Sequence, residues 1–151
     1  MILYLDTSAH IKQYVRENGS ELVAQLIGQA EQVGCALIGQ AEMMATVGKL
    51  VRMKLLSRGT ALIKIEEIRS DWLDVVHLQI TDSLVAHAGD LAWQHGLRGY
   101  DAVHLAAALA WQDGLRLPVT LTTFDKQLWE AAKAEGLLPQ PDDLAPYTRA
   151  S

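Results

Sequence analysis

Four acidic side chains stand at separate points of this 151-residue chain where an apolar run gives way to a helix. Asp6, Asp101 and Asp125 fall where an apolar run stops and a helix is expected to begin, and Glu42 falls in the first turn of another expected helix. One carboxylate at such a place is ordinary, because carboxylates cap helices and favour the positive end of the helix dipole. Four of them at one edge of a sheet would form a cluster that calls for a hard divalent metal.

The elements that must position these acids alternate between strands and helices. Short apolar runs predict strands at 2–5, 35–38, 75–80 and 119–121. Amphipathic spacing and helix-stop residues predict helices at 7–15, 20–30, 40–56, 60–72, 81–95, 100–111 and 125–135. The apolar stripe expected to be buried in the helix at 60–72 is Leu62, Ile65, Ile68 and Trp72. Alternation of this kind favours parallel pairing with right-handed crossovers. We therefore expect a three-layer α/β/α sandwich with a small parallel sheet over residues 1–138, followed by an extended C-terminal tail at 139–151.

Composition restricts the classes of protein that this chain can be. The net charge is −5, which argues against a broad nucleic-acid-binding surface, although it allows a local basic rim around a metal site. Cys35 is the single cysteine, so an internal disulfide is excluded and a reducing, cytoplasmic setting is expected. The apolar start at 1–5 is too short for a signal peptide, and no apolar run approaches the ~20 residues that cross a membrane.

The segments around the four acids resemble the four motifs of PIN-domain nucleases. The matching segments are Leu5-Asp6-Thr7-Ser8, Ala41-Glu42-Met43, the run from Leu97 to Ala106 that contains Gly99-Tyr100-Asp101-Ala102, and Thr122-Thr123-Phe124-Asp125-Lys126-Gln127-Leu128. Length and motif order are similar to those of the VapC-like toxins of prokaryotic toxin–antitoxin pairs. One departure is Ala41, where serine or threonine is common in the family. The resemblance implies an endoribonuclease that depends on Mg²⁺ or Mn²⁺ and is held inactive by a cognate antitoxin.

The chemistry of phosphodiester cleavage assigns roles to these residues. Water attack needs an activated nucleophile and a stabilised leaving oxyanion, which one or two carboxylate-held metals supply. Because Mg²⁺ binds through only one or two protein carboxylates, Asp6 and Asp101 are the expected direct ligands. Glu42 and Asp125 would hold a second metal or act through a water ligand of the first. The residues expected to orient carboxylates or a phosphate are Thr7, Ser8, Thr123 and Arg98, with helix capping an equal alternative for Ser8 and Thr123.

The expected partners are an RNA substrate, a cognate antitoxin and a second copy of the chain in a homodimer, with no membrane association. Two other functions stay open at this point: a catalytically silent PIN-like binding module and a receiver-like phospho-signalling domain. A receiver would need an acidic pair after the first strand and a lysine near the last strand, whereas this chain has one acid at Asp6 and places Lys126 after an acid. His104 is expected to pack or to support a neighbouring site residue rather than to catalyse, and Asp82 is a reserve candidate for the site.

Overall fold

The computed structural model describes residues 1–148. At its centre is a five-stranded, all-parallel sheet with the strand order β3-β2-β1-β4-β5. The central strand β1 is buried along its whole length, as its apolar sequence predicts. The strands are β1 (Ile2–Leu5), β2 (Gln32–Ala36), β3 (Val76–Leu78), β4 (Val119–Thr122) and β5 (Leu138–Gln140).

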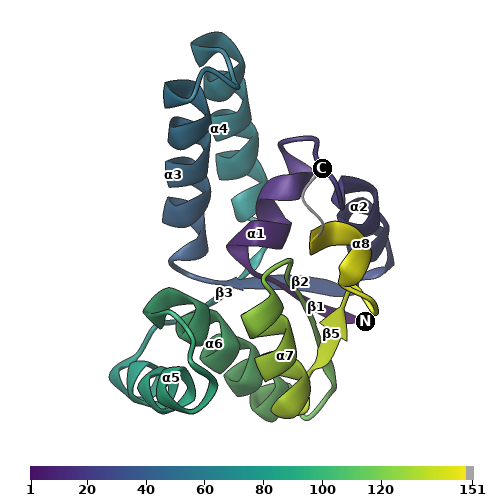
Figure 1. Cartoon of the computed structure of the whole chain (residues 1–151), viewed down its shortest axis with the longest axis vertical. Helices are drawn as coiled ribbons and strands as arrows, with labels where there is room; N and C mark the ends of the chain where they lie inside the picture. Colours follow the sequence, from purple (N-terminus) through teal and green to yellow (C-terminus); the bar gives the residue numbers. More distant parts are fainter. Residues whose placement is uncertain (149–151) are drawn as a thin grey trace.

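Helices cover both faces of this sheet (Figure 1). The helical segments are α1 (Thr7–His10), the 3-10 turn η1 (Ile11–Gln13), α2 (Ser20–Gln29), α3 (Gly39–Arg52), α4 (Arg58–Trp72), α5 (Asp82–His95), α6 (Gly99–Leu115), α7 (Lys126–Ala134) and α8 (Ala145–Thr148). The predicted three-layer α/β/α architecture is confirmed.

Side chains of β1 alternate between two separate cores. Ile2 and Tyr4 point into the larger core, which α5, α6 and α7 complete. Leu3 and Leu5 point to the opposite face and pack with Ala9 of α1 and with residues of α2. This alternation follows from the two-residue period of a strand, and it leaves Asp6 at the exit of β1 on the edge between the layers.

Helices α3 and α4 form a hairpin that stands out from the sheet (Figure 1). The hairpin has its own core, built around Met43 and Val47 of α3 and Ile68 and Trp72 of α4. In this way the first turn of α3, which carries Glu42, is anchored against the sheet while the far end of the hairpin projects away.

The structure corrects several sequence-based predictions of local structure. The strand predicted at 75–80 is only Val76–Leu78, the helix predicted at 40–56 ends at Arg52, and the helix predicted at 7–15 is the short α1 followed by η1.

The second strand was expected at 35–38, but β2 ends at Ala36, and Leu37 and Ile38 are exposed. The segment after residue 138 was expected to be an extended tail, but it contributes the fifth strand, β5, and helix α8. Leu62 was expected on the buried stripe of α4, but it is exposed and Ala61 is buried instead. Residues 149–151 of the predicted tail lie outside the described residues.

A helix that crosses a bilayer needs about 20 predominantly apolar residues. Over residues 1–148, none of the helices is both long and apolar enough to cross a membrane.

Candidate active site

The four predicted acids line a single pocket at the carboxyl ends of β1 and β4. These strands are neighbours, and the chain builds β2 and β3 on one side of β1 but β4 and β5 on the other. Such a switch in strand order opens a crevice where α/β proteins bind ligands. The pocket has a volume of about 440 Å³, and its acidic lining residues are Asp6, Glu42, Asp101 and Asp125. Their predicted convergence is therefore seen, while their roles stay predictions.

Asp6 is a buried carboxylate held by short hydrogen bonds from uncharged donors. Its Oδ1 accepts from the Ala9 N–H at 2.9 Å, which caps α1, and from the Ser8 hydroxyl at 2.7 Å. Its Oδ2 accepts from the Thr123 hydroxyl at 2.6 Å. The residue is only 3% exposed, and this burial raises the pKa of the carboxyl above its ordinary value although the hydrogen bonds oppose the change.

Two hydroxyl groups tie Asp6 to the turn that follows β4. The Ser8 hydroxyl accepts the Phe124 N–H at 3.0 Å, and the Thr123 hydroxyl accepts the Asp125 N–H at 3.1 Å. Asp125 in turn caps α7, since its Oδ1 accepts the Leu128 N–H at 2.9 Å. The predicted orienting role of Ser8 and Thr123 thus has a geometric basis: these hydroxyls fix the distance between the first and fourth motifs.

Arg98 bridges the other two aspartates. Its Nε donates to Asp101 Oδ2 at 3.0 Å, and its Nη2 lies 3.6 Å from Asp125 Oδ2. Asp101 stands in the first turn of α6 and is buried, while the Arg98 side chain is 62% exposed. Burial raises the pKa of the Asp101 carboxyl, and the guanidinium of Arg98 opposes that shift.

Glu42 accepts a hydrogen bond from the buried side chain of His104. The Nε2–H of His104 donates to Glu42 Oε1 at 2.7 Å, and its Nδ1 shares a 2.7 Å hydrogen bond with the Tyr4 hydroxyl. That hydroxyl also accepts the Ala36 N–H at 3.0 Å. Burial lowers the pKa of His104, but its contacts with Cys35 and Glu42 outweigh burial and raise it to about 10. The buried ring fits the expectation that His104 packs or supports a site residue, because it orients Glu42.

Several contributors to this pocket could not be identified from the sequence. Tyr4 looks like an ordinary core residue of a strand, and only the fold brings its hydroxyl to His104. Tyr100 and Phe124 line the pocket and directly precede Asp101 and Asp125, and Thr46 lines it one helical turn after Glu42. Their positions next to motif residues were the available signal. Thr7 was predicted, and its hydroxyl lies 3.5 Å from His104 Nε2.

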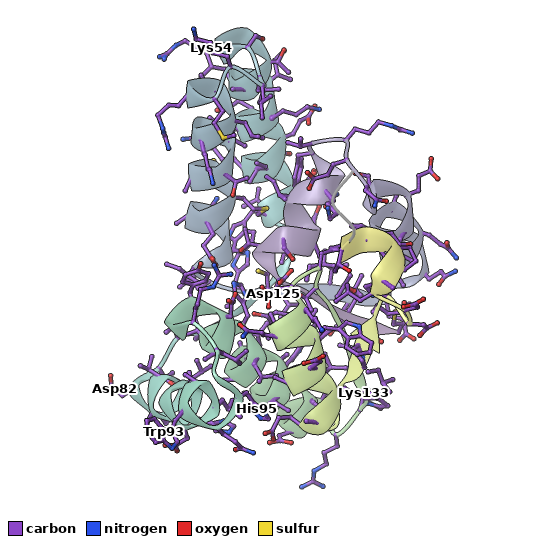
Figure 2. All side chains as sticks on the ribbon, viewed as in Figure 1. Lys54, Asp82, Trp93, His95, Asp125 and Lys133 are labelled. Carbon is purple, nitrogen blue, oxygen red and sulfur yellow. The ribbon has the colours of Figure 1, made fainter. Side chains whose placement is uncertain are left out.

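Asp82, the reserve candidate, lies outside this site. Figure 2 shows it on the outer side of α5, far from Asp125 in the centre of the molecule. It follows the true helix cap, Thr81, whose hydroxyl accepts the Leu84 N–H at 3.2 Å. The receiver-like arrangement is not formed either, because Lys126 is exposed and its Nζ lies 4.0 Å from Glu130 rather than in the pocket.

The donor set of the pocket fits a divalent metal in type and charge. Four carboxylates supply the oxygen ligands that Mg²⁺ and Mn²⁺ prefer. When all four are ionised, Arg98 and His104 together leave at least two negative charges of the lining without a cation. Over residues 1–148, however, no three acidic, histidine or cysteine side chains already stand in a metal-binding group. Because Arg98 and His104 engage three of the four carboxylates, side chains must rearrange before a metal is held.

Comparison with known proteins identifies the family. The sequence model described as the PIN domain matches residues 3–134. The chain belongs to the PIN-domain family. The chain is 32% identical to Ribonuclease VapC45 of Mycobacterium tuberculosis over 145 residues, which cover 96% of this chain and 99% of the relative.

Solved structures agree with this fold. PAE2754 from Pyrobaculum aerophilum superposes with a TM-score of 0.67 at 18% identity, over 97% of this chain and 94% of the other chain. A chain of a toxin-antitoxin complex from Klebsiella pneumoniae superposes with a TM-score of 0.59 at 18% identity, over 83% and 87% of the two chains. At such identities the likeness supports the PIN-domain fold alone.

Proposed function

We propose that this PIN domain is an endoribonuclease that depends on a divalent metal, Mg²⁺ or Mn²⁺, and acts as the toxin of a toxin–antitoxin pair in the cytoplasm. The observation that carries the proposal is the pocket in which Asp6, Glu42, Asp101 and Asp125 meet at the ends of β1 and β4. The nearly full-length relative named Ribonuclease VapC45 supports the same reaction class.

In this proposal Asp6 and Asp101 hold the metal directly, while Glu42 and Asp125 complete the site or hold a second ion. When bound, the metal activates the attacking water and stabilises the leaving oxyanion. The hydroxyls of Ser8 and Thr123 keep Asp6 at a fixed distance from the turn that carries Asp125. Preorganisation of this kind lets the carboxylates act without rearranging during the reaction.

His104 and Arg98 have different tasks in the same mechanism. His104 is buried, and its hydrogen bond to Glu42 fixes the direction in which that carboxylate faces the pocket. Arg98 is exposed at the pocket mouth, where its guanidinium can bind a phosphate of the RNA in the bidentate geometry that arginine favours.

Metal-dependent cleavage is tested by incubating the purified protein with RNA in EDTA and then adding back Mg²⁺ or Mn²⁺. We expect no cleavage in EDTA and recovery when either metal is restored. Cleavage that persists in EDTA would contradict the metal requirement. Absence of cleavage under every metal condition and with every RNA tested would favour the catalytically silent binding module.

The proposed partners are an antitoxin and a second copy of the chain. The toxin-antitoxin complex from Klebsiella pneumoniae contains a chain of this fold. The apolar residues of the long helix at 40–56, such as Met43, Met44 and Met53, suggest a partner surface from sequence. In the structure Met43 is buried in the core, whereas Met53 is exposed at the end of α3. We expect a small antitoxin to co-purify from the native operon, and light scattering to show a homodimer. A chain that purifies alone from its operon, or a monomer at every concentration, would contradict these two partners respectively.

A further inference from the structure

Arg98 forms ion pairs with two of the four pocket carboxylates, Asp101 and Asp125. Its guanidinium reaches Asp101 Oδ2 at 3.0 Å and Asp125 Oδ2 at 3.6 Å, so one cation joins the carboxylates of the third and fourth motifs. No other residue of the pocket lining, within the part of the chain that the structure describes, contacts both of these acids through an ion pair.

The remaining oxygens of Asp125 and Asp6 are already engaged by the backbone and by hydroxyl groups. Asp125 Oδ1 caps α7 by accepting the Leu128 N–H. Asp6 Oδ1 accepts from Ser8 and Ala9, and Asp6 Oδ2 accepts from Thr123. The oxygen of Asp125 that is free of a structural cap is therefore the one that faces Arg98. A metal that binds to both Asp101 and Asp125 must compete with this guanidinium.

We propose that Arg98 is a competing cation: it neutralises Asp101 and Asp125 before the metal binds, leaves them when the metal binds, and is then available to a substrate phosphate. This inference rests on the proposed metal-dependent function. It assigns Arg98 a part in setting the metal affinity as well as in binding RNA.

The side chain is suited to such a change of partner. It is 62% exposed, so leaving the carboxylates removes it from contacts at the pocket mouth and not from a packed core. Its guanidinium carbon lies 5.1 Å from the centroid of the Tyr100 ring, a contact that does not depend on the two carboxylates. Although Asp101 is buried, the guanidinium lies mostly in water, which weakens the ion pair, so a divalent ion can displace it.

The proposal predicts opposite effects of one substitution on metal affinity and on cleavage. Arg98→Ala and Arg98→Gln remove the competing charge, and we expect Mn²⁺ to bind the metal-free protein about 3- to 10-fold more tightly, as the strength of exposed ion pairs indicates. At saturating Mn²⁺ we expect both variants to cleave RNA more slowly than the wild type, because the phosphate contact is lost. A residue with only a structural role would weaken both properties together.

Isothermal titration with Mn²⁺ at fixed pH and salt measures the affinity without reference to activity. Lys126→Ala is the matched control, because Lys126 adjoins Asp125 in sequence but points to Glu130, so the same charge is lost away from the carboxylates. We expect the Mn²⁺ affinity of this control to stay at the wild-type value. Arg98→Gln keeps most of the side-chain stem, which separates the loss of charge from any loss of packing on Tyr100.

The outcomes distinguish this inference from the proposed function. Unchanged or weaker Mn²⁺ binding by both Arg98 variants would overturn the competition, and so would an equal gain in Lys126→Ala. Tighter binding with unimpaired cleavage at saturating Mn²⁺ would overturn the transfer of Arg98 to a phosphate. If the wild type and all variants bind no Mn²⁺, the metal site itself is absent and the proposed function fails together with the inference.

Discussion

At the scale of single residues, burial governs the charges of the site more than mutual repulsion does. Sequence reasoning expects four converging carboxylates to raise one another's pKa values. In the structure, the first cause of the raised pKa values of Asp6 and Asp101 is the loss of water around them, and the charge of Asp125 adds to the shift of Asp101. A buried negative charge destabilises the metal-free fold at neutral pH, because a raised carboxyl pKa favours folding only at lower pH.

Asp101→Asn should therefore stabilise the metal-free protein. The substitution removes a charge that is disfavoured by burial, and the gain is offset only in part by the lost ion pair with the exposed Arg98. Urea unfolding at pH 7 in EDTA measures the effect, with Asp82→Asn as the control because Asp82 is exposed on α5. A variant that unfolds at lower urea than the wild type would show that the Asp101 carboxylate stabilises the fold.

The buried side chain of His10 should make the stability of the folded protein fall at acidic pH. It is 1% exposed, its Nδ1 has no hydrogen-bond partner among residues 1–148, and the groups that face it are Asp71, His104 and the rings of Tyr14 and Trp72. Burial lowers its pKa from 6.5 to about 4, which outweighs the opposite effect of Asp71. Between these values the unfolded chain binds a proton that the folded protein does not, so stability falls as pH falls from 6.5 toward 4.

His10→Leu tests this pH dependence, because leucine is similar in size to histidine and does not titrate. We expect the wild type to lose on the order of 3 kcal/mol more than the variant between pH 7 and pH 4. Urea unfolding at a series of pH values provides the comparison, since the other titrating groups are common to both proteins. Equal pH dependence in the two proteins would mean that His10 takes up its proton without cost in the folded state.

The sequence predicted the site residues that local patterns mark, but not the contacts between residues on different elements. The four acids were found because their positions at strand ends follow from local patterns and from the rule that parallel strands end at one edge. The contacts of Tyr4 with His104 and of Arg98 with Asp125 were not found. These pairs lie on different elements, and their meeting depends on how far each helix is rotated against the sheet.

At the scale of elements, the sheet shows where local patterns fail. β5 was missed because Pro139 lies in its middle and the run around it is short. The strand is nevertheless formed, since it pairs only with β4 at the edge of the sheet, where proline is tolerated. In the same way Leu62 was assigned to the buried stripe of α4, although the projecting hairpin leaves that part of the helix in solvent.

Close approach between α6 and β2 gives a prediction about packing. A Cβ added at Gly34 would lie 2.6 Å from Trp111 Cζ3, and the Trp111 ring is buried in the main core. Gly34→Ala should therefore lower the free energy of unfolding by about 1–3 kcal/mol, the scale of overpacking in a core.

Gly89→Ala is the control for Gly34→Ala, because the added Cβ meets nothing within 4 Å and the residue lies inside α5. There the change should stabilise the protein by up to about 1 kcal/mol through helix propensity. Thermal and urea unfolding measure both variants. If Gly34→Ala is as stable as the wild type, then α6 can shift on the sheet and does not fix the position of Asp101 as rigidly as the structure indicates.

At the scale of the whole molecule, the fold gathers residues that lie more than a hundred positions apart in sequence into one pocket. Asp6 enters from the first strand and Asp125 from the turn after the fourth, and the reversal of strand order at β1 makes them neighbours. A ligand that binds across this junction holds several elements together at once. Its binding free energy is then added to the stability of the folded state.

Metal should therefore raise the melting temperature of the whole protein. At a hundredfold excess of Mn²⁺ over its dissociation constant, binding adds about 2.7 kcal/mol, which for a chain of this length corresponds to roughly 5–10 °C. Asp101→Asn should show a much smaller rise, because one proposed ligand is lost. Melts in EDTA and in Mn²⁺ provide the comparison, and a wild-type melt that does not respond to Mn²⁺ would contradict a metal site that joins these elements.

The most direct test of the central claim is the single-turnover rate of RNA cleavage at saturating Mn²⁺ for the wild type, Asp101→Asn and Asp82→Asn. Both substitutions remove one aspartate charge from the first turn of a helix, but only Asp101 lines the pocket. If the four carboxylates form the catalytic metal site, Asp101→Asn should cleave at least ~10²-fold more slowly and Asp82→Asn at the wild-type rate. Cleavage by Asp101→Asn at the wild-type rate would show that the pocket at the ends of β1 and β4 is not where the reaction takes place.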